Sequence, residues 1–481
     1  MVSFLPRDPG SRGTRRFRTA ARRNDGEVVA DHIRTMIVWG ELRSGERLVP
    51  EEIAEELGIS RIPVREGIIA LEREGWVAVE PRRGSFVRGI DRRTAHDHYV
   101  LLGAVHGFVA VRATQRAQEA DVRMLAEHAR QIRRAGCVHD TTDVYDSFTT
   151  VLRAAARSVR ADRLLRVLPE YASADTFDDR EEVMRIQRHG VRAVVAGVEA
   201  RNTAQAAAAA REVHRELGAC VERFLTSRGI FAREPGDTAP RSPVRWHGAF
   251  GRRSRASRLA PVDSGAERAV HHVREQIIRG ELAPRQRLDR ESIADAIGVS
   301  RTPMREAVVA LEREGWITVE PHRGAFVNAF DADYVRDHYE IFAIIFGLAT
   351  TLTCQRGGEA AVGRLLTFQP ALRAASDPES FERVNAEILD LIIEAADSPP
   401  LIGALRAMPE IVPDFFRQVP GAMQAQARGF DEVCAALRDG DTDQVETAWW
   451  SLMSGVADRV VDFLDRRDPG ATRVSAAGCR G

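Results

Sequence analysis

The chain is an internal duplication. Residues 61–87 recur at residues 301–327, with 18 identities in 27 aligned positions and no gap. Within this stretch, the seven residues from Ala70 to Trp76 return unchanged from Ala310 to Trp316, at an offset of 240. Solenoid repeats have periods of about 20–50 residues. A period of 240 therefore indicates that each copy is a multidomain unit.

Composition divides each copy into a small domain and a longer helical domain. The first residues carry seven arginines among Gly, Pro and Ser, which predicts a disordered tail. A stretch rich in Gly, Pro, Ser and Arg between the copies has little periodicity and predicts a flexible linker. The expected boundaries are a tail at 1–26, a small domain at 27–90, a helical domain at 91–227, a linker at 228–263, the second small domain at 264–330, the second helical domain at 331–467 and a tail at 468–481.

The second small domain shows the expected elements most clearly. A helix over 269–279 ends at Gly280, and a short helix over 291–297 ends at Gly298, a glycine that permits a left-handed turn. Ser300 is expected to cap a third helix, with Pro303 in the first turn, where a missing N–H costs little.

The third helix is expected to bury Val308, Val309 and Leu311 and to end at Gly315. Two short β runs, 317–320 and 325–328, flank a turn and predict a hairpin. Helix, helix, tight turn, third helix and hairpin together make a winged helix-turn-helix. The first copy has the same signals, with Gly58, Ser60, Pro63, Gly75 and the turn at 81–84.

Arginines on the third helix point to DNA. Arg61 and Arg65 are four residues apart and share one face at the start of that helix, as do Arg301 and Arg305. A recognition helix meets base edges in the major groove with this end, where an arginine can pair with guanine or a phosphate. The chain has 69 basic residues, all of them arginine, against 70 acidic ones, so only local charge supports this argument.

Plainer interpretations of the same residues remain open. Arg65 and Arg305 could be solvated helix charges paired with nearby glutamates, and Gly84 and Gly324 simple turn glycines. We interpret Trp76 and Trp316 as core residues.

The motif Ser-Arg-x-Pro-x-Arg-Glu, followed by Leu-x-x-Glu-Gly-Trp and Pro-x-Arg-Gly-x-Phe-Val, resembles the GntR family of bacterial transcription regulators in both copies. One departure is Ile62, where the family usually has the threonine seen at Thr302, so a hydroxyl that could reach phosphate is missing. The resemblance implies DNA contacts by Ser60, Arg61, Arg65, Arg83 and Gly84, and by Ser300, Arg301, Thr302, Arg305, Arg323 and Gly324.

The two longer domains have helical periodicity, with apolar stripes along 203–225 and 445–463. They resemble the all-α FCD effector domain of the FadR subfamily. The expected fold class is therefore mainly α, with two winged helix-turn-helix domains that are each followed by an all-α helical-bundle domain.

Many relatives with this domain bind a metal through one Asp and three His, and the matching positions here are mostly apolar. His189 and His214 lie one or two positions off register, about 100° or 200° around a helix. We predict no metal and no cofactor, with a rearranged site at His106, His189 or His214 as the open alternative. The positions that align with the family's ligands are Tyr145, Thr149, Val191 and Val213 in the first copy, and Asn385, Leu389, Phe430 and Leu452 in the second.

The arginine that often anchors a carboxylate effector in these relatives is replaced by Leu102 and Phe342. The second copy has an apolar run over 339–347 at this point. Either the pocket takes an apolar ligand or it has collapsed into core, and we favour a collapsed pocket or a purely dimer-like role.

Other classes of protein fit less well. Five scattered cysteines without a CxxC pair suggest neither zinc nor disulfides, and the start of the chain has no apolar signal-peptide core. The longest apolar stretch, 341–352, is shorter than the roughly 20 residues of a membrane helix. No catalytic motif stands out. We therefore expect a cytoplasmic protein that is neither an enzyme nor a membrane protein.

The sequence predicts a DNA-binding transcription regulator, a repressor, with two GntR-type units in one chain. Related single-unit regulators bind palindromes as homodimers. Here the two units could pair within one chain as a pseudo-dimer, or the chain could form a homodimer. The expected partners are double-stranded DNA and a small-molecule effector. The alternative function is an effector-binding protein in which one or both DNA-binding units are degenerate.

Overall fold

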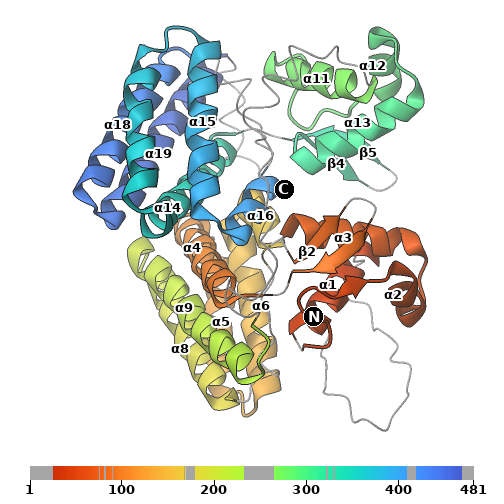
Figure 1. Cartoon of the computed structure of the whole chain (residues 1–481), viewed down its shortest axis with the longest axis vertical. Coiled ribbons are helices and arrows are strands. Elements are labelled where there is room, and N and C mark those ends of the chain that lie inside the picture. Colours follow the sequence, from red (N-terminus) through yellow and green to blue (C-terminus); the bar gives the residue numbers. More distant parts are fainter. Residues whose placement is uncertain are drawn as a thin grey trace. The chain divides into compact units, whose positions relative to one another are not determined.

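The computed structural model of the chain is mainly α-helical and contains two compact units, formed mainly by residues 1–244 and 245–481 (Figure 1). The predicted tails and most of the predicted linker, at residues 1–24, 232–264 and 468–481, lie outside the described residues. The structure describes residues 25–38, 40–74, 76–80, 83–88, 90–166, 168, 179–231, 265–320, 323–328, 331–408 and 419–467.

Each unit contains a winged helix-turn-helix. The first has three helices and a three-stranded antiparallel sheet of order β1-β3-β2, in which Val77 pairs with Val87 and Glu80 with Gly84. The elements are α1 (Asp25–Val38), β1 (Arg47–Leu48), α2 (Pro50–Leu57), α3 (Arg61–Glu74), β2 (Val77–Glu80) and β3 (Gly84–Val87).

The second winged helix repeats this layout. Its hairpin pairs Ile317 with Val327 and Glu320 with Gly324, and a single bridge from Arg287 to Phe326 takes the place of β1. The predicted hairpins are confirmed in both copies. The elements are α11 (Gly265–Ile278), α12 (Arg290–Ile297), α13 (Arg301–Glu314), β4 (Ile317–Glu320) and β5 (Gly324–Val327).

A single apolar core holds each winged helix together. In the second unit it gathers side chains from the three helices and the hairpin around Trp316, which is fully buried. Trp76 is also buried, so the interpretation of both tryptophans as core residues is confirmed.

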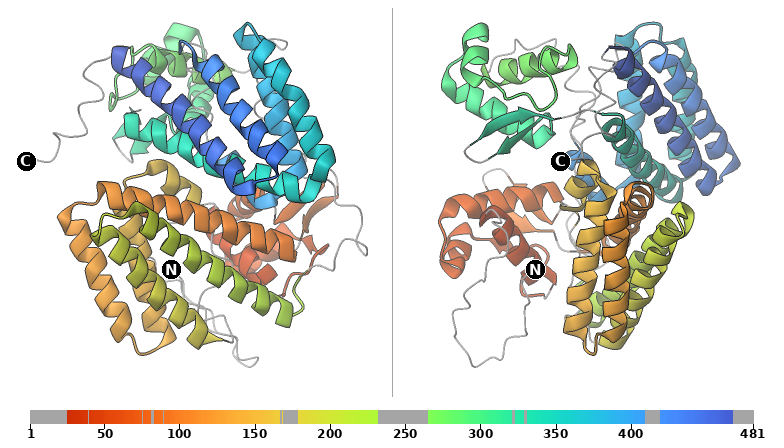
Figure 2. Two further views of the ribbon diagram at one scale, coloured as in Figure 1. Left: turned by 90° about the vertical axis from the view of Figure 1, so that its left-hand side faces the viewer. Right: turned by 180° about the vertical axis from the view of Figure 1, so that it is seen from behind.

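The longer domain of each unit is a bundle whose helices run side by side (Figure 2). No helix among the described residues is long and apolar enough to cross a membrane. The first bundle contains α4 (Arg92–Arg116), α5 (Glu119–Arg134), α6 (Val138–Ala156), α7 (Val159–Arg166), α8 (Arg180–Glu199) and α9 (Thr203–Ser227). The second bundle contains α14 (Ala332–Ala374), α15 (Pro378–Ala396), α18 (Ala422–Asp439) and α19 (Thr442–Arg467). The chain between α15 and α18 includes α16 (Pro399–Ala407), most of which is assigned to the first compact unit.

Helix boundaries show that the duplication extends through the helical domains. The starts of α4, α6 and α7 return 240 residues later in α14, α15 and α16, and the start of α9 returns after 239 residues in α19. α14 also contains a kink at Gly358, which matches the break between α4 and α5.

Local details repeat as well. α6 and α15 both end on a non-glycine residue in the left-handed conformation, Arg157 (φ 48°) and Asp397 (φ 43°). An arginine guanidinium donates to the last helical carbonyl of each, from Arg116 to Ala156 at 3.2 Å and from Arg356 to Ala396 at 2.6 Å. The two helical domains therefore share one architecture.

The left-handed turn before α13 gives a testable prediction. Gly298 has φ 66°, where an L side chain is strained by about 1–2 kcal/mol. Gly298→Ala should therefore destabilise α13 by about that amount, which hydrogen exchange of the peptides from 301–314 would measure. Gly363→Ala is the matched control, because Gly363 lies inside α14 with open space around its Cα and should slow exchange there. Unchanged exchange of α13 in Gly298→Ala would contradict this account of the turn.

Candidate DNA interface

The tight turn before the third helix fixes where that helix begins. Gly298 ends α12 in the left-handed region, and the next amide, of Val299, donates to the Ala294 carbonyl at 3.0 Å. Gly58 closes α2 in the same way with φ 66°. This glycine turn was predicted and is confirmed, and it starts the third helices at Arg61 and Arg301.

The outward face of α13 presents two arginines at the start of the helix. The Arg301 side chain is 87% exposed and forms an ion pair with Glu291 on α12 at 3.0 Å. Such an exposed pair contributes only about 0–1 kcal/mol, so a phosphate can compete for the guanidinium. Arg305 is exposed and has no hydrogen-bond or ion-pair partner within the described part of the chain.

α3 repeats this arrangement. Arg61 pairs with Glu51 at 3.1 Å, and Arg65 is exposed without a polar partner among the described residues. Among the described residues, neither Arg65 nor Arg305 pairs with a nearby glutamate, so the structure does not support the alternative that they are ordinary paired helix charges. Both guanidinium groups are accessible to a ligand.

Ser300 differs in part from its prediction. It occupies the N-cap position of α13, but its side chain makes no capping hydrogen bond. The usual donor to an N-cap hydroxyl is the N–H three residues on, and that residue is Pro303, which has none. Ser60 stands in the same relation to Pro63 and is exposed. The hydroxyl of Ser300 is therefore not used within the helix.

The inward face of α13 corrects another expectation. Val309 was predicted to be buried, and this is wrong, because its side chain is 65% exposed. Val308 and Leu311 are buried as predicted, and Met304 is buried as well. One residue turns a helix by about 100°, so Val309 points away from the core that holds Val308.

The hairpin tips form the wings. Gly84 and Gly324 begin the second strand with φ 112° and 116°, values that L side chains rarely adopt. The preceding residues, Arg83 and Arg323, are exposed and pair across the turn with Glu80 and Glu320.

Sequence reasoning missed one arginine beside each wing. A side chain at Gly84 would meet the Arg47 Nε atom at 3.1 Å, and one at Gly324 would meet Arg287 Nε at 2.9 Å. Both arginines are exposed. Arg47 and Arg287 are 240 residues apart, the offset of the duplication, and this repetition could have drawn attention to them. That they lie beside the wing is visible only in the folded structure. Each wing glycine thus lies between two arginines.

The helical domains show where the predicted metal-site positions lie. Tyr145, Val191, Phe430 and Leu452 are buried core residues. Within the described residues, no group of three His, Cys, Asp or Glu side chains is placed to hold a metal ion. The absence of a metal stays a prediction.

Two of the three histidines considered for a rearranged site do meet. His106 on α4 and His214 on α9 are buried and stack with ring centroids 4.1 Å apart, whereas His189 is exposed. His214 Nδ1 lies 2.8 Å from the Ala210 carbonyl, and its Nε2 has no hydrogen-bond partner among the described residues.

Burial sets the charge state of this pair. It holds the pKa of His106 well below the usual value, with the nearby His214 and Arg153 acting in the same direction. Burial also lowers the pKa of His214, to about 4. Both imidazoles are therefore neutral at pH 7.

The second copy fills the matching place with apolar rings. Phe346, 240 residues after His106, stacks on Trp449 of α19 with centroids 5.4 Å apart and on Phe342 at 5.8 Å. The Trp449 indole donates to the Thr350 hydroxyl at 2.9 Å. This part of the domain interior is closely packed, which favours the collapsed-pocket interpretation of the run over 339–347.

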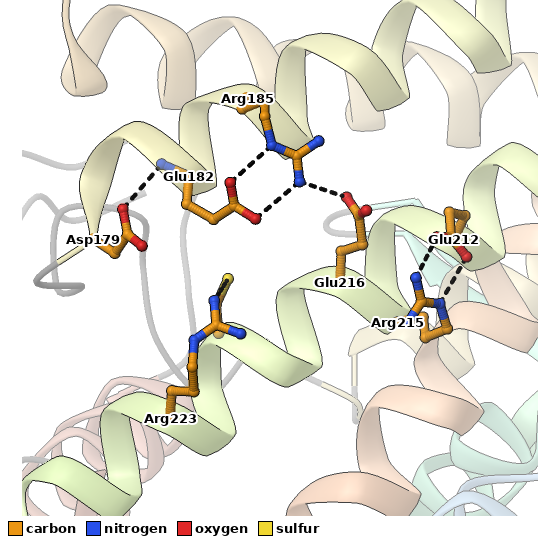
Figure 3. A network of polar contacts seen from close by, with 8 residues as sticks. Asp179, Glu182, Arg185, Glu212, Arg215, Glu216 and Arg223 are labelled. Carbon is orange, nitrogen blue, oxygen red and sulfur yellow. Dashed lines mark hydrogen bonds and ion pairs between the residues drawn. The ribbon is translucent and has the colours of Figure 1, made fainter.

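A polar network lies on the surface of α8 and α9 (Figure 3). Arg185 donates to Glu182 at 2.7 Å and to Glu216 at 3.4 Å, so it links the two helices. The hydrogen bonds from Arg185 lower the pKa of the Glu182 carboxyl. Because the Arg185 side chain is 54% exposed, each of these ion pairs contributes only about 0–1 kcal/mol to the bundle.

Comparison with known proteins identifies these domains. The profile of the bacterial regulatory proteins of the gntR family matches residues 26–87 and 265–327, the two winged helices. The FCD domain profile matches residues 337–455. Each winged helix therefore matches the gntR-family profile over nearly its whole length. The FCD resemblance of the first helical domain and the FadR subfamily remain predictions.

Individual relatives are transcription regulators. An HTH-type regulator of Mycobacterium tuberculosis is 29% identical over 150 residues, which cover 31% of this chain and 62% of the relative. A regulator of Streptomyces ambofaciens is 42% identical over 73 residues, or 15% of this chain and 31% of the relative. The chain thus spans about three fifths, or less, of the length of these relatives.

Among solved structures, Lar of Listeria monocytogenes aligns with 42% of this chain and 99% of its own, at 18% identity and a TM-score of 0.32. McbR of Escherichia coli aligns with 41% of this chain and 98% of its own, at 18% identity and a TM-score of 0.31.

The stacked histidines give a prediction on pH. Their folded-state pKa values lie below the unfolded value of about 6.5. The unfolded chain therefore binds protons that the folded domain excludes. Stability should be full above pH 6.5 and fall toward pH 4, by at most about 1.4 kcal/mol per pH unit for each histidine. Thermal melting of the chain between pH 7 and pH 5 would measure this loss.

Two variants separate the pair from other titrations. His106→Phe combined with His214→Leu should lose less melting temperature between pH 7 and pH 5 than the wild type. His189→Gln, at an exposed histidine, should behave as the wild type does. Equal pH dependence in all three proteins would show that the pair does not control acid stability.

Proposed function

We propose that the chain is a sequence-specific DNA-binding transcription regulator in which α3 and α13 enter the major groove. One observation carries this proposal above the others. Arg65 and Arg305 stand at equivalent positions on the outward faces of the two third helices, exposed and without polar partners among the described residues. An arginine in this position is suited to the bidentate acceptor pair of guanine.

The surrounding residues are assigned by their chemistry. Ser60 and Ser300, at the helix starts, suit phosphate together with the free N–H groups of the first turn. Arg61, Arg301 and Thr302 lie beside them on the helix face. Arg83 and Arg323, next to Gly84 and Gly324, suit the backbone of the groove that each wing follows, and Arg47 and Arg287 add a second cation to each wing.

We further propose that the two units act as a pseudo-dimer within one chain on a two-part operator, as a cytoplasmic repressor. The shared architecture of the two helical domains supports this pairing, because each unit carries the same domain at the same offset. The relatives described above are named as transcription regulators, not as enzymes.

A second candidate is an effector-binding protein whose DNA-binding units are degenerate. The FCD match favours this candidate, because a protein that senses an effector needs a domain to bind it. The packed aromatic rings of the second bundle favour a structural role for that copy. We therefore place DNA recognition first and effector binding second.

Substitution of the two central arginines tests the DNA-binding proposal. Duplexes are selected from a random pool, and affinity for the selected duplex is measured by fluorescence anisotropy. Arg65→Ala and Arg305→Ala should each cost about 1–3 kcal/mol and relax selection at one half of the site. Arg123→Ala and Arg364→Ala, at exposed arginines of α5 and α14, are the matched controls and should leave affinity unchanged. No enrichment of any duplex, without or with candidate ligands, would sink the proposal.

The pseudo-dimer is tested by mass and stoichiometry. Light scattering at micromolar concentration should give one chain in solution and one chain per selected duplex, because both halves of the operator are occupied by a single chain. An obligate dimer or tetramer of chains would refute the pairing of units within one chain while leaving DNA recognition intact.

A further inference from the structure

Exposed apolar side chains gather on the third helices. Eight large hydrophobic residues are substantially exposed among the described residues, and three of them lie on α3 and α13. They are Ile62, 70% exposed, Val309, 65% exposed, and Ile69, 44% exposed. Ile62 is the most exposed of the eight.

These residues share the face of the arginines. At about 100° per residue, Ile62 and Ile69 lie roughly 100° and 80° around α3 from Arg61, on the side of Arg65. On the same scale Arg65 lies at roughly 40°, and the buried core side chains Val64 and Leu71 lie on the other flank, at roughly −60° and −80°. The face that carries the free guanidinium group is therefore partly apolar.

The exposed apolar residues of this face differ in polarity between the two units at one position. Residue 62 is isoleucine in the first unit, and its counterpart 240 residues later is Thr302, whereas Ile69 is matched by Val309. Ile62 thus adds one exposed branched aliphatic side chain directly beside Arg61. A group of this kind next to a cation has one apolar counterpart in the major groove, the C5-methyl group of thymine.

We propose that Ile62 reads a thymine methyl group in the half-site of the first unit, and that Thr302, which has one methyl group and a hydroxyl in place of the larger aliphatic side chain, selects for it less strongly in the second. The inference rests on the proposed DNA-binding function and refines it. The two halves of the operator then differ at the base pair that faces this position, and one chain binds the operator in a single orientation.

Removal of one methyl group from the DNA tests this directly. The half-site whose affinity falls in Arg65→Ala is assigned to the first unit, and each thymine in it is replaced singly by deoxyuridine, which lacks only the methyl. For the wild type, one replacement should weaken binding about fourfold, the equivalent of about 0.8 kcal/mol for a buried methyl-sized group. For Ile62→Ser, whose side chain has no methyl group, the same replacement should have no effect. The exposed position makes this variant safe for folding.

Thr302→Ile provides the reciprocal test, because it should increase the sensitivity to deoxyuridine in the other half-site. If the wild type binds the selected duplex and no replacement in the first half-site changes its affinity, the inference is wrong and the proposed function stands. If sensitivity persists in Ile62→Ser, the methyl group contacts another side chain and the assignment to Ile62 is overturned. A change in oligomeric state of Ile62→Ser with unchanged DNA selection would assign Ile62 to a protein contact instead. A chain that binds no duplex overturns the inference together with the proposed function.

Discussion

The rotation of each third helix about its own axis is the constraint on which the candidate interface depends. In α13 it is set by the burial of Met304, Ala307 and Leu311 against the rest of the winged-helix core. These residues recur every three or four positions, so a rotation by one residue would bring Arg305 and Glu312, or Glu306, toward the core. The turn at Gly298 separately fixes where the helix starts. The positions of Arg301 and Arg305 along the helix axis and their angles around it are therefore both determined. The arginines of the candidate interface are thus placed by the buried side chains on the other face of the helix.

Duplication preserves this geometry while allowing the exposed chemistry to change. Inward positions stay apolar in both copies, as in the pairs Val64 with Met304 and Leu71 with Leu311. A change at such a position would open a cavity or overpack the core, at a cost of about 1–5 kcal/mol. An exposed position carries no comparable cost, so isoleucine can stand at 62 and threonine at 302. Buried positions of the third helix are therefore constrained to apolar residues in both copies, whereas its exposed positions can change without loss of stability.

Local signals made much of the winged helix predictable. Gly58, Gly298 and Gly315 end helices because only glycine adopts the left-handed conformation without strain, and this depends on the neighbouring residues alone. The predictions at Ser300 and Val309 were less successful for opposite reasons. Pro303 removes the donor that Ser300 would use, which the sequence could have shown. The exposure of Val309 depends on where the centre of the core lies, which two adjacent valines do not reveal.

Tertiary proximity was harder to predict than local structure. Arg47 lies beside Gly84, and His106 beside His214, across 37 and 108 residues of chain. Neither pair belongs to a local pattern. The sequence did bring His106 and His214 into consideration, because the metal-ligand positions of the resembled domain pass close to them. It could not show that they stack as a neutral buried pair, since that requires the relative rotation of α4 and α9.

The interior of the helical domains carries an asymmetry that the shared architecture conceals. At the same place between the first and last helices, the first unit stacks two imidazoles and the second stacks Phe346 on Trp449. Apolar rings keep their character at any pH and gain from burial alone. Imidazoles gain the same burial but lose it on protonation, since a buried cation without a partner is unstable. The second bundle also contains a buried histidine, His338, whose ring centroid lies 4.7 Å from that of Phe342. The asymmetry therefore concerns this one place, where two imidazoles stack on each other in the first unit and apolar rings stack in the second.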